Sequence, residues 1–443
     1  MNLTGKRPTF RKQKAESNPY RILVLLVLLI ISVFILRSIE QGEIQPPFLP
    51  TPIPTRTAHS YALEGETHFK AGNLNESISA YQQAVQVDPN DAEIWAELAR
   101  IQTYSSALLT TDADKKARLD DAIEAIDTAV ELSPENSTVH AIRAFVLDWY
   151  SNPSIAGEES DDILNDAEQA AVLAIQLDNQ NTLALSYYAE ILVDRQALLQ
   201  AEQYSNQALE RDPSLMDVHR IHALVRESLG YYRDAIDEYN AALEITPNLT
   251  FLYINIGVNY RQLKEYDMAL DYFAKAATIN EQLDIQDPLP YIAISKTYSQ
   301  MGEFFIASRN VMKALQFKPE DPDIYATLGV VYFKSRNYEG AIPAFKCALE
   351  GCNPVESCEV RQCFDENDPA IEITGMPLSP STVVYYYTYG SVLAGMHQPF
   401  NNHCEKAMEV LSLVREDFND EPIIMDIVEA SEQICISFGF NRQ

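Results

Sequence analysis

The sequence predicts an all-α protein: a right-handed superhelical solenoid of helical hairpins preceded by one transmembrane helix. Three observations predict it. An unbroken apolar run occupies residues 22–36. A helical pattern of large and small residues recurs from about residue 58, mostly with a period of 34 residues. At 443 residues the chain is also too long for one ordinary globular core, which favours an array of repeats.

Charge separates the N-terminal tail from the rest of the chain. Residues 1–21 hold six basic side chains and one acidic one, a net charge of +5. Since the whole chain carries −31, the remainder carries −36. Such an acidic body repels phosphate backbones, so we expect no nucleic-acid partner.

The apolar run ILVLLVLLIISVFIL at residues 22–36 is flanked by Arg21 and Arg37. At 1.5 Å per residue it spans about 22 Å, short of the ~30 Å hydrocarbon core, and the flanking arginines can extend it by snorkelling. No small-x-small cleavage pattern follows it. We therefore expect a retained signal-anchor helix over residues 22–39; a cleaved signal peptide and a buried core helix are the alternatives.

The basic tail predicts the orientation of this anchor. Six basic residues precede the apolar run, whereas only Arg37 and Arg56 lie in the twenty residues after it. The positive-inside rule then leaves residues 1–21 in the cytoplasm and places the repeats on the outer face of the cytoplasmic membrane. Residues 40–57 hold five prolines, which excludes helix and predicts an extended linker.

Eight repeat units follow over residues 58–350. Their second helices resemble one another, as in AEQYSNQALERDPSL (201–215) and AIDEYNAALEITPNL (235–249). The second and third units each carry an eleven-residue insertion, around Tyr104–Asp114 and Tyr150–Asp162. In the first helix of each unit a large residue is followed four positions later by a small one, which allows two helix axes to cross closely. These pairs are Tyr61/Gly65, Trp95/Ala99, His140/Ala144, Leu185/Ala189, His219/Ala223, Tyr253/Gly257, Tyr291/Ser295 and Tyr325/Gly329.

With the prolines that end many units, this pattern resembles the tetratricopeptide repeat (TPR) family. His140 and His219 are exceptions, because a polar histidine occupies the position of the large residue in these two units. Residues 351–380 read as a cysteine-containing loop insertion. Residues 381–443 read as a ninth, degenerate repeat and a capping helix, which an end repeat needs to cover its last apolar face.

The resemblance implies a protein or peptide ligand in a concave groove lined by first helices. The groove residues are expected directly after the large anchor and four positions further on, in the sixth to eighth units. An apolar strip of this kind suits an apolar peptide or helix, unless the chain's own C-terminal segment covers it. The candidates at these positions are Ile254, Val258, Ile292, Lys296, Ala326 and Val330. Phe251, Leu289 and Phe333 are also candidates because helical spacing puts them on the same face.

Two ligand signatures of TPR relatives are incomplete here. The carboxylate clamp of chaperone-binding members is matched by Arg220, Asn255 and Lys296, but its other positions hold apolar residues. The asparagine ladder of sugar-transferring relatives is matched only by Asn255. The sequence therefore does not predict either ligand.

All six cysteines lie after residue 346, at Cys347, Cys352, Cys358, Cys363, Cys404 and Cys435. An even number in an exported segment predicts disulfides, with free thiols and a metal site as alternatives. Cys404 begins one expected helix and Cys435 nearly ends the next. Since a short connection makes these helices antiparallel, we expect a Cys404–Cys435 bond. The other four allow three pairings, of which Cys352–Cys358 with Cys347–Cys363 is weakly favoured.

No catalytic motif, nucleotide loop or zinc helix is present, so we expect no enzyme activity, cofactor or metal. His219 and His222 share a helix face, and an acidic run occupies residues 158–166, but repeat positions and a solvated insertion explain them. We expect a non-enzymatic, membrane-anchored scaffold that binds other proteins. The alternative is a cytoplasm-facing adaptor or regulatory subunit of an envelope-assembly or proteolysis system.

Overall fold

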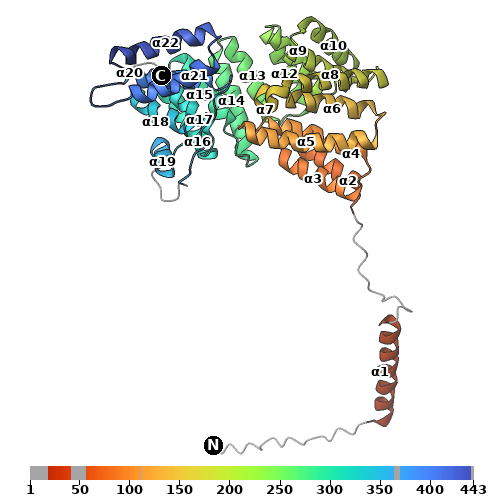
Figure 1. Cartoon of the computed structure of the whole chain (residues 1–443). Coiled ribbons are helices and arrows are strands. Elements are labelled where there is room, and N and C mark those ends of the chain that lie inside the picture. The colour runs from red at the N-terminus through yellow and green to blue at the C-terminus, as the bar shows by residue number, and fades with distance from the viewer. Residues whose placement is uncertain (1–17, 41–55, 110, 364–369, 441–443) are drawn as a thin grey trace, which may run out of the picture. The chain divides into compact units, whose positions relative to one another are not determined.

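The computed structural model describes residues 18–40, 56–109, 111–363 and 370–440 (Figure 1). The chain divides into two units, Met1–Arg56 and Thr57–Gln443. The regular elements of the described residues are helices, with isolated bridges at Cys352/Ile373 and Gln398/Asn401. The expected basic tail and proline-rich linker lie almost wholly outside the described residues.

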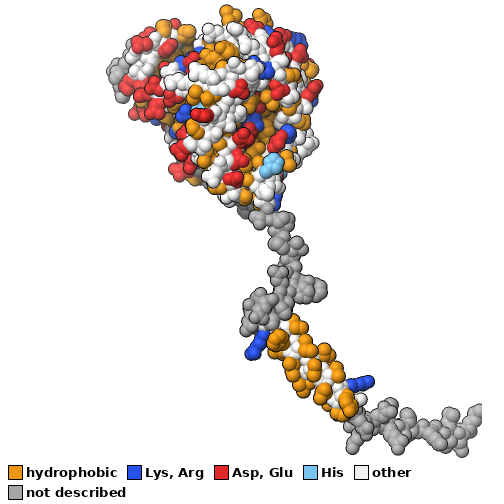
Figure 2. Space-filling model, turned by 90° about the vertical axis from the view of Figure 1, so that its right-hand side faces the viewer, with side chains coloured by type: hydrophobic (Ala, Val, Ile, Leu, Met, Phe, Trp, Pro, Cys, Tyr) orange, Lys and Arg blue, Asp and Glu red, His pale blue; other side chains and the backbone are white. Residues whose placement is uncertain are grey.

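The first unit contains the helix α1, Pro19–Glu40. Its described apolar side chains are exposed, and Figure 2 shows mostly hydrophobic side chains along it, with a basic side chain near each end. Within the described part of the chain, none of the helices combines the length and apolarity required to cross a membrane.

In the second unit the helices form successive antiparallel hairpins, one for each repeat of the sequence. The first four hairpins are α2 (Ala58–Lys70) with α3 (Leu74–Val87), α4 (Ala92–Ser106) with α5 (Asp112–Leu132), α6 (Ser137–Tyr150) with α8 (Ser160–Leu177), and α9 (Thr182–Asp194) with α10 (Leu198–Arg211). The next four are α11 (Met216–Ser228) with α12 (Tyr232–Ile245), α13 (Thr250–Gln262) with α14 (Tyr266–Gln282), α15 (Leu289–Met301) with α16 (Phe304–Phe317), and α17 (Pro322–Lys334) with α18 (Tyr338–Leu349). Both insertions are partly helical: the first lengthens α5, and the second forms α7 (Pro153–Ala156) and η1 (Gly157–Glu159) before α8.

In three of these hairpins, the small residue of the first helix packs against an aromatic ring of the second helix. A Cβ atom added to Gly257 would lie 2.5 Å from Cε1 of Phe273, and one added to Gly329 would lie 2.8 Å from the Phe345 ring. Gly65 has the same relation to Tyr81. The glycines are therefore required for close packing rather than for backbone conformation.

The superhelix is tight enough for early and late repeats to touch. Arg100 of α4 forms an ion pair with Asp217 of α11 at 3.1 Å, and Tyr104 of α4 stacks on Phe251 of α13 with ring centroids 5.7 Å apart. One continuous core runs from Ala58 to Ile256. A second core, from Ile292 to Cys435, holds the C-terminal hairpins together. In Figure 1, α13 and α14 lie between these two groups of helices.

The segment expected as a loop at residues 351–380 contains a helix, α19 (Pro354–Arg361), started by a capping box between Asn353 and Glu356. The chain ends in the hairpin α20 (Val383–Gly395) with α21 (Cys404–Asp417), followed by α22 (Pro422–Ser437), which packs against both. This is the looser ninth unit and its cap.

Three disulfides join the six cysteines. Cys404 and Cys435 are bonded, as the antiparallel arrangement of α21 and α22 predicts, with Cα atoms 5.3 Å apart. The weakly favoured pairing of the other four is wrong, because the bonds are Cys347–Cys352 and Cys358–Cys363. Each closes across a helix end: the chain reverses after α18 at Gly351, whose φ is +82°, and after α19 at Gln362, whose φ is +57°.

We predict that the double substitution Cys404→Ser with Cys435→Ser lowers the free energy of unfolding of the C-terminal cap by about 3–4 kcal/mol, because the bond closes a loop of roughly 30 residues. Urea unfolding followed by circular dichroism measures this. The matched control, Cys358→Ser with Cys363→Ser, opens a much shorter loop and should cost roughly 2 kcal/mol. Equal losses in the two variants would contradict the loop-length argument.

Candidate functional site

The predicted groove residues lie on α13, α15 and α17, but they do not share one surface. Phe251, Ile292 and Ala326 are buried in the two cores, so we correct their assignment: they support the groove and do not face a ligand. Ile254, Val258 and Leu289 are half-buried against neighbouring repeats. Val330 is half-buried as well, whereas Lys296 and Phe333 are exposed.

Lys296 and Val330 line a cavity of about 260 Å³ between the first helices of three successive repeats and α20. Its other lining residues are Arg261, Ser299, Gln300, Thr327, Val331, Lys334 and Tyr385. Three of the lining side chains are cationic and none is acidic, in a chain with a net charge of −31. The apolar strip that the sequence predicted is therefore a mixed apolar and basic surface. We call this cavity, together with Phe333, which is exposed three positions after Val330 on α17, the C-terminal groove.

Two polar groups at the C-terminal groove have no hydrogen-bond partner in the described part of the chain. The Nη1 atom of Arg261 and the hydroxyl of Ser299 are buried and make no hydrogen bond there. Burial also lowers the pKa of Arg261 from its ordinary value. Tyr385 of α20 donates a hydrogen bond to Asp323 at 3.1 Å and forms one wall of the groove. The chain's own C-terminal segment, the alternative occupant of the strip, therefore contributes one wall of the groove through Tyr385.

The concave face of the N-terminal repeats has a different structure, because buried polar side chains fill it. The Asp217 carboxylate accepts hydrogen bonds from Tyr104 at 2.5 Å and Tyr187 at 2.7 Å, in addition to the ion pair with Arg100. Burial alone would raise the pKa of Asp217, but Arg100 and the two hydroxyls outweigh it and the pKa is lowered.

A second buried ion pair adjoins the first. Arg220 forms a bidentate pair with Glu190 at 2.6 and 2.8 Å, and its Nε donates to the Tyr104 hydroxyl at 3.0 Å. Trp149 donates its indole N–H to Glu190 at 3.0 Å. Arg220, a candidate clamp residue in the sequence, is thus occupied inside the protein and cannot hold a ligand carboxylate.

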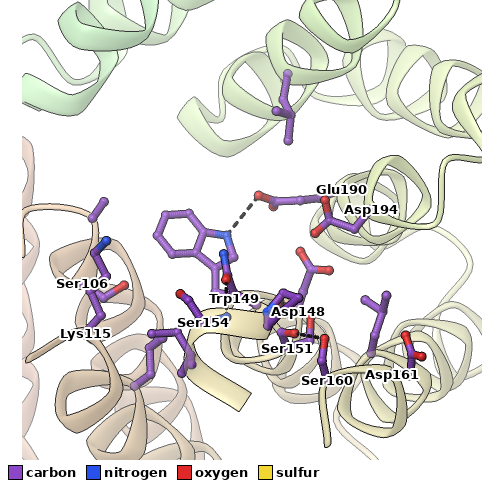
Figure 3. A pocket seen from close by; sticks show the side chains of 17 residues that line it. Ser106, Lys115, Asp148, Trp149, Ser151, Ser154, Ser160, Asp161, Glu190 and Asp194 are labelled. Carbon is purple, nitrogen blue, oxygen red and sulfur yellow. Dashed lines mark hydrogen bonds between the residues drawn. The ribbon is translucent and has the colours of Figure 1, made fainter. Parts of the chain in front are cut away.

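A larger cavity, of about 570 Å³, lies beside this network (Figure 3). Both insertions contribute to its wall: Ser106 and Ala107 come from the first, Ser154 and Asp161 come from the second, and Lys115 directly follows the first. The remaining lining residues are Ala107, Leu119, Asp148, Trp149, Ser151, Asn152, Pro153, Ile155, Ser160, Leu164, Glu190, Asp194 and Leu224. We call it the insertion cavity.

Carboxyl groups gather on one side of the insertion cavity, where Figure 3 shows Asp148, Glu190 and Asp194 near one another. Asp148 is only 3% exposed, and its side chain is hydrogen-bonded to that of Asp194. Burial and then the neighbouring Asp194 raise the pKa of Asp148 well above its ordinary value. Burial and Glu190 raise the pKa of Asp194 to about 6.

The insertion cavity was not predicted from the sequence, although the sequence contains a signal for it. Two consecutive repeats each carry an insertion of the same length, and insertions in a solenoid fall on one face, often the binding face. The other rejected sites have structural roles. His219 bonds to Glu238 and to the carbonyl of Pro213, and His222 bonds to Ser205. No group of side chains suited to hold a metal ion occurs in the described ranges.

Comparisons with known proteins agree with this architecture. A family model described as "TPR repeat" matches residues 65–103, and one described as "Tetratricopeptide repeat" matches residues 252–283. Among curated proteins, the BBSome complex member BBS4 of Bos taurus is 31% identical over 113 residues, which are 26% of this chain and 21% of that protein. The probable UDP-N-acetylglucosamine–peptide N-acetylglucosaminyltransferase SPINDLY of Hordeum vulgare is 31% identical over 101 residues, 21% of this chain and 11% of that protein.

Similar solved structures include a thermophilic TPR protein of Thermus thermophilus, TTC0263, with a TM-score of 0.37, 17% identity and coverage of 46% of this chain and 98% of that one. The human IFIT1 dimer with m7Gppp-AAAA has a TM-score of 0.48 and 16% identity, and the match covers 74% of this chain and 78% of that one. The chain spans about a fifth of the length of the first curated relatives it matches. The described chain is an all-helical solenoid that contains tetratricopeptide repeats.

Proposed function

We propose that this chain is a non-enzymatic scaffold that binds a protein partner in the C-terminal groove. The proposal rests on the difference between the two concave faces. Polar side chains fill the N-terminal face, whereas Lys296, Phe333 and Lys334 of the C-terminal groove stay exposed around apolar residues.

The chemistry of the groove suits an acidic, amphipathic segment. Arg261, Lys296 and Lys334 offer charge-assisted hydrogen bonds to carboxylates, and Val330 and Phe333 offer apolar contact. The cations also give local attraction to an acidic partner that the rest of this acidic chain would repel. The same acidity makes nucleic acid an unfavourable partner.

The double substitution Lys296→Glu with Lys334→Glu should reduce partner binding at least tenfold, because it reverses two charges at the groove while both side chains are exposed. A photocrosslinking residue at Val330 would identify the partner in the parent protein and report its loss in the variant. The matched control is Arg309→Glu with Lys313→Glu, which makes the same charge change on the second helix α16. Crosslinking that both pairs reduce equally, or that neither reduces, would contradict the groove assignment.

The proposal includes membrane attachment through residues 22–36, with the repeats on the outer face of the cytoplasmic membrane. The exposed apolar surface of α1 and its flanking arginines support an anchor, and the basic tail supports the orientation. Three disulfides in the C-terminal repeats support an oxidising compartment, where such bonds persist.

A reporter enzyme that is active only outside the cytoplasm, fused after Gln443, should be active in intact cells, because the positive-inside rule exports everything after the anchor. The control is a reporter active only in the cytoplasm, fused at the same position, which should be silent. The reverse pattern would favour the cytoplasm-facing adaptor.

A further inference from the structure

We propose that one face of the last helix, α22, is a dimer interface that pairs with the same face of a second copy of this chain. This inference goes beyond the proposed function, because α22 shares no residue with the C-terminal groove or with the insertion cavity. Figure 1 shows α22 at the edge of the C-terminal group of helices.

An apolar stripe runs along the uncovered side of α22. Its members recur every three or four residues, so they share one face of the helix, and the last of them is the residue directly after it. One of them, Ile427, is half-buried and the others are exposed. The stripe consists of Ile423, Ile427, Ala430, Ile434 and Phe438. A different face of α22, which contains Val428 and Cys435, is buried against the preceding repeat.

In an inner repeat, the next repeat covers the same positions. Because α17 and α22 both begin with proline, Asp323 of α17 corresponds to Ile423 of α22. The next first helix, α20, places Tyr385 against Asp323 with a hydrogen bond of 3.1 Å. Among the described helices none follows α22, and Ile423 is left exposed. Since the end of a solenoid normally has a polar outer face, this apolar one indicates an interface.

The order of large and small residues in the stripe is self-complementary. In an antiparallel pair of α22 helices, Ile423 comes opposite Phe438 of the second copy. Ile427 then comes opposite Ile434 of the second copy, since both pairs are centred on the same point of the helix. Ala430 lies next to that point, where a small residue lets two helix axes cross closely. A two-fold dimer requires a surface that is complementary to itself in this way.

The charges on α22 favour the antiparallel pair. The first half of the helix carries the exposed acids Asp426 and Glu429, whereas Gln433 and Ser437, exposed in the second half, are neutral. Antiparallel pairing sets each acidic half beside the neutral half of the other copy, and a parallel pair would set like charges side by side. A lipid surface is a poorer occupant, because helices that lie on membranes carry Lys or Arg beside the apolar face and α22 has neither.

The area of the stripe predicts a weak dimer. Ile423, Ile434 and Phe438 are 79%, 40% and 52% exposed, so the stripe offers on the order of 400 Å² of apolar surface in each copy. With a polar rim, the pair would reach about 1,200 Å², the lower limit for specific complexes, which suggests a dissociation constant on the order of 10 μM. Because each copy carries a net charge of −31, screening by salt should strengthen the dimer.

A single added thiol in the full chain tests the interface, because all six native cysteines are bonded. Ala430→Cys, purified in dodecyl maltoside and treated with bismaleimidoethane at about 50 μM protein, should give a covalent dimer. The matched control Gln433→Cys, on the polar face of the same helix, should give at least fivefold less. Chains with Ile423→Cys should crosslink to chains with Phe438→Cys, and neither should crosslink to itself.

Ile434→Glu should weaken the dimer at least tenfold in sedimentation velocity, whereas Gln433→Glu adds the same charge to the polar face and should change the affinity less than twofold. Raising NaCl from 50 to 500 mM should strengthen the parent dimer.

Equal crosslinking from Ala430→Cys and Gln433→Cys would overturn the interface, as would a dimer that Ile434→Glu does not weaken, which would place the contact elsewhere, on α1 for example. A monomer up to 200 μM protein, a dimer that salt weakens, or an Ala430→Cys thiol that another segment shields from maleimide would also overturn it. Self-crosslinking of Ile423→Cys would contradict the antiparallel arrangement. The crosslinks decide the question even if Ile434→Glu fails to fold.

Discussion

The buried carboxylate of Asp217 is the constraint on which the arrangement of the N-terminal repeats depends. It joins α4 to α11 through Arg100 and also receives the hydroxyls of Tyr104 and Tyr187. In an ideal solenoid each repeat contacts only its neighbours, and stability is a sum over adjacent interfaces. Here a charge pair and a stacked aromatic pair connect the second repeat with the fifth and sixth, so this part of the superhelix closes on itself. Removing one partner of a buried pair typically costs about 3–5 kcal/mol, because the other charge is left uncompensated.

Closure of the N-terminal concave face explains where ligands can bind. The side chains that a concave groove would present there, Arg220 and Glu190 among them, are already paired with one another. Ligand access is left to the C-terminal groove, which belongs largely to the second core, and to the insertion cavity, which the two lengthened repeats build beside the network. The lining of the C-terminal groove is basic, and that of the insertion cavity is acidic.

Local packing could be predicted from the sequence, and long-range closure could not. Gly257 and Phe273 are in contact within one hairpin, and both belong to one 34-residue repeat. Their close packing can therefore be predicted from the repeat pattern. The Cys404–Cys435 bond could be predicted for the same reason, because it joins successive antiparallel helices. The Cys358–Cys363 bond depends on α19, which the sequence pattern presented as loop, and the Cys347–Cys352 bond depends on the chain reversal at Gly351 after α18. Contact between residues 100 and 217 depends on the rotation accumulated over three repeats, which no local pattern encodes, so Arg220 and Phe251 were expected on an open surface and are buried instead.

Amide hydrogen exchange of Asp217→Ala tests the closure most directly. We predict that the amides of α4 lose protection from exchange together with those of α11, although 117 residues separate the paired side chains. The amides of α15 to α18, in the second core, should keep their protection. The matched control is Glu202→Ala, which removes an ion pair at 2.8 Å between the adjacent helices α10 and α11 and should affect those helices alone. If Asp217→Ala weakens protection only in α11 and its immediate neighbours, as Glu202→Ala is expected to do, the repeats behave as an open solenoid and the closure is contradicted.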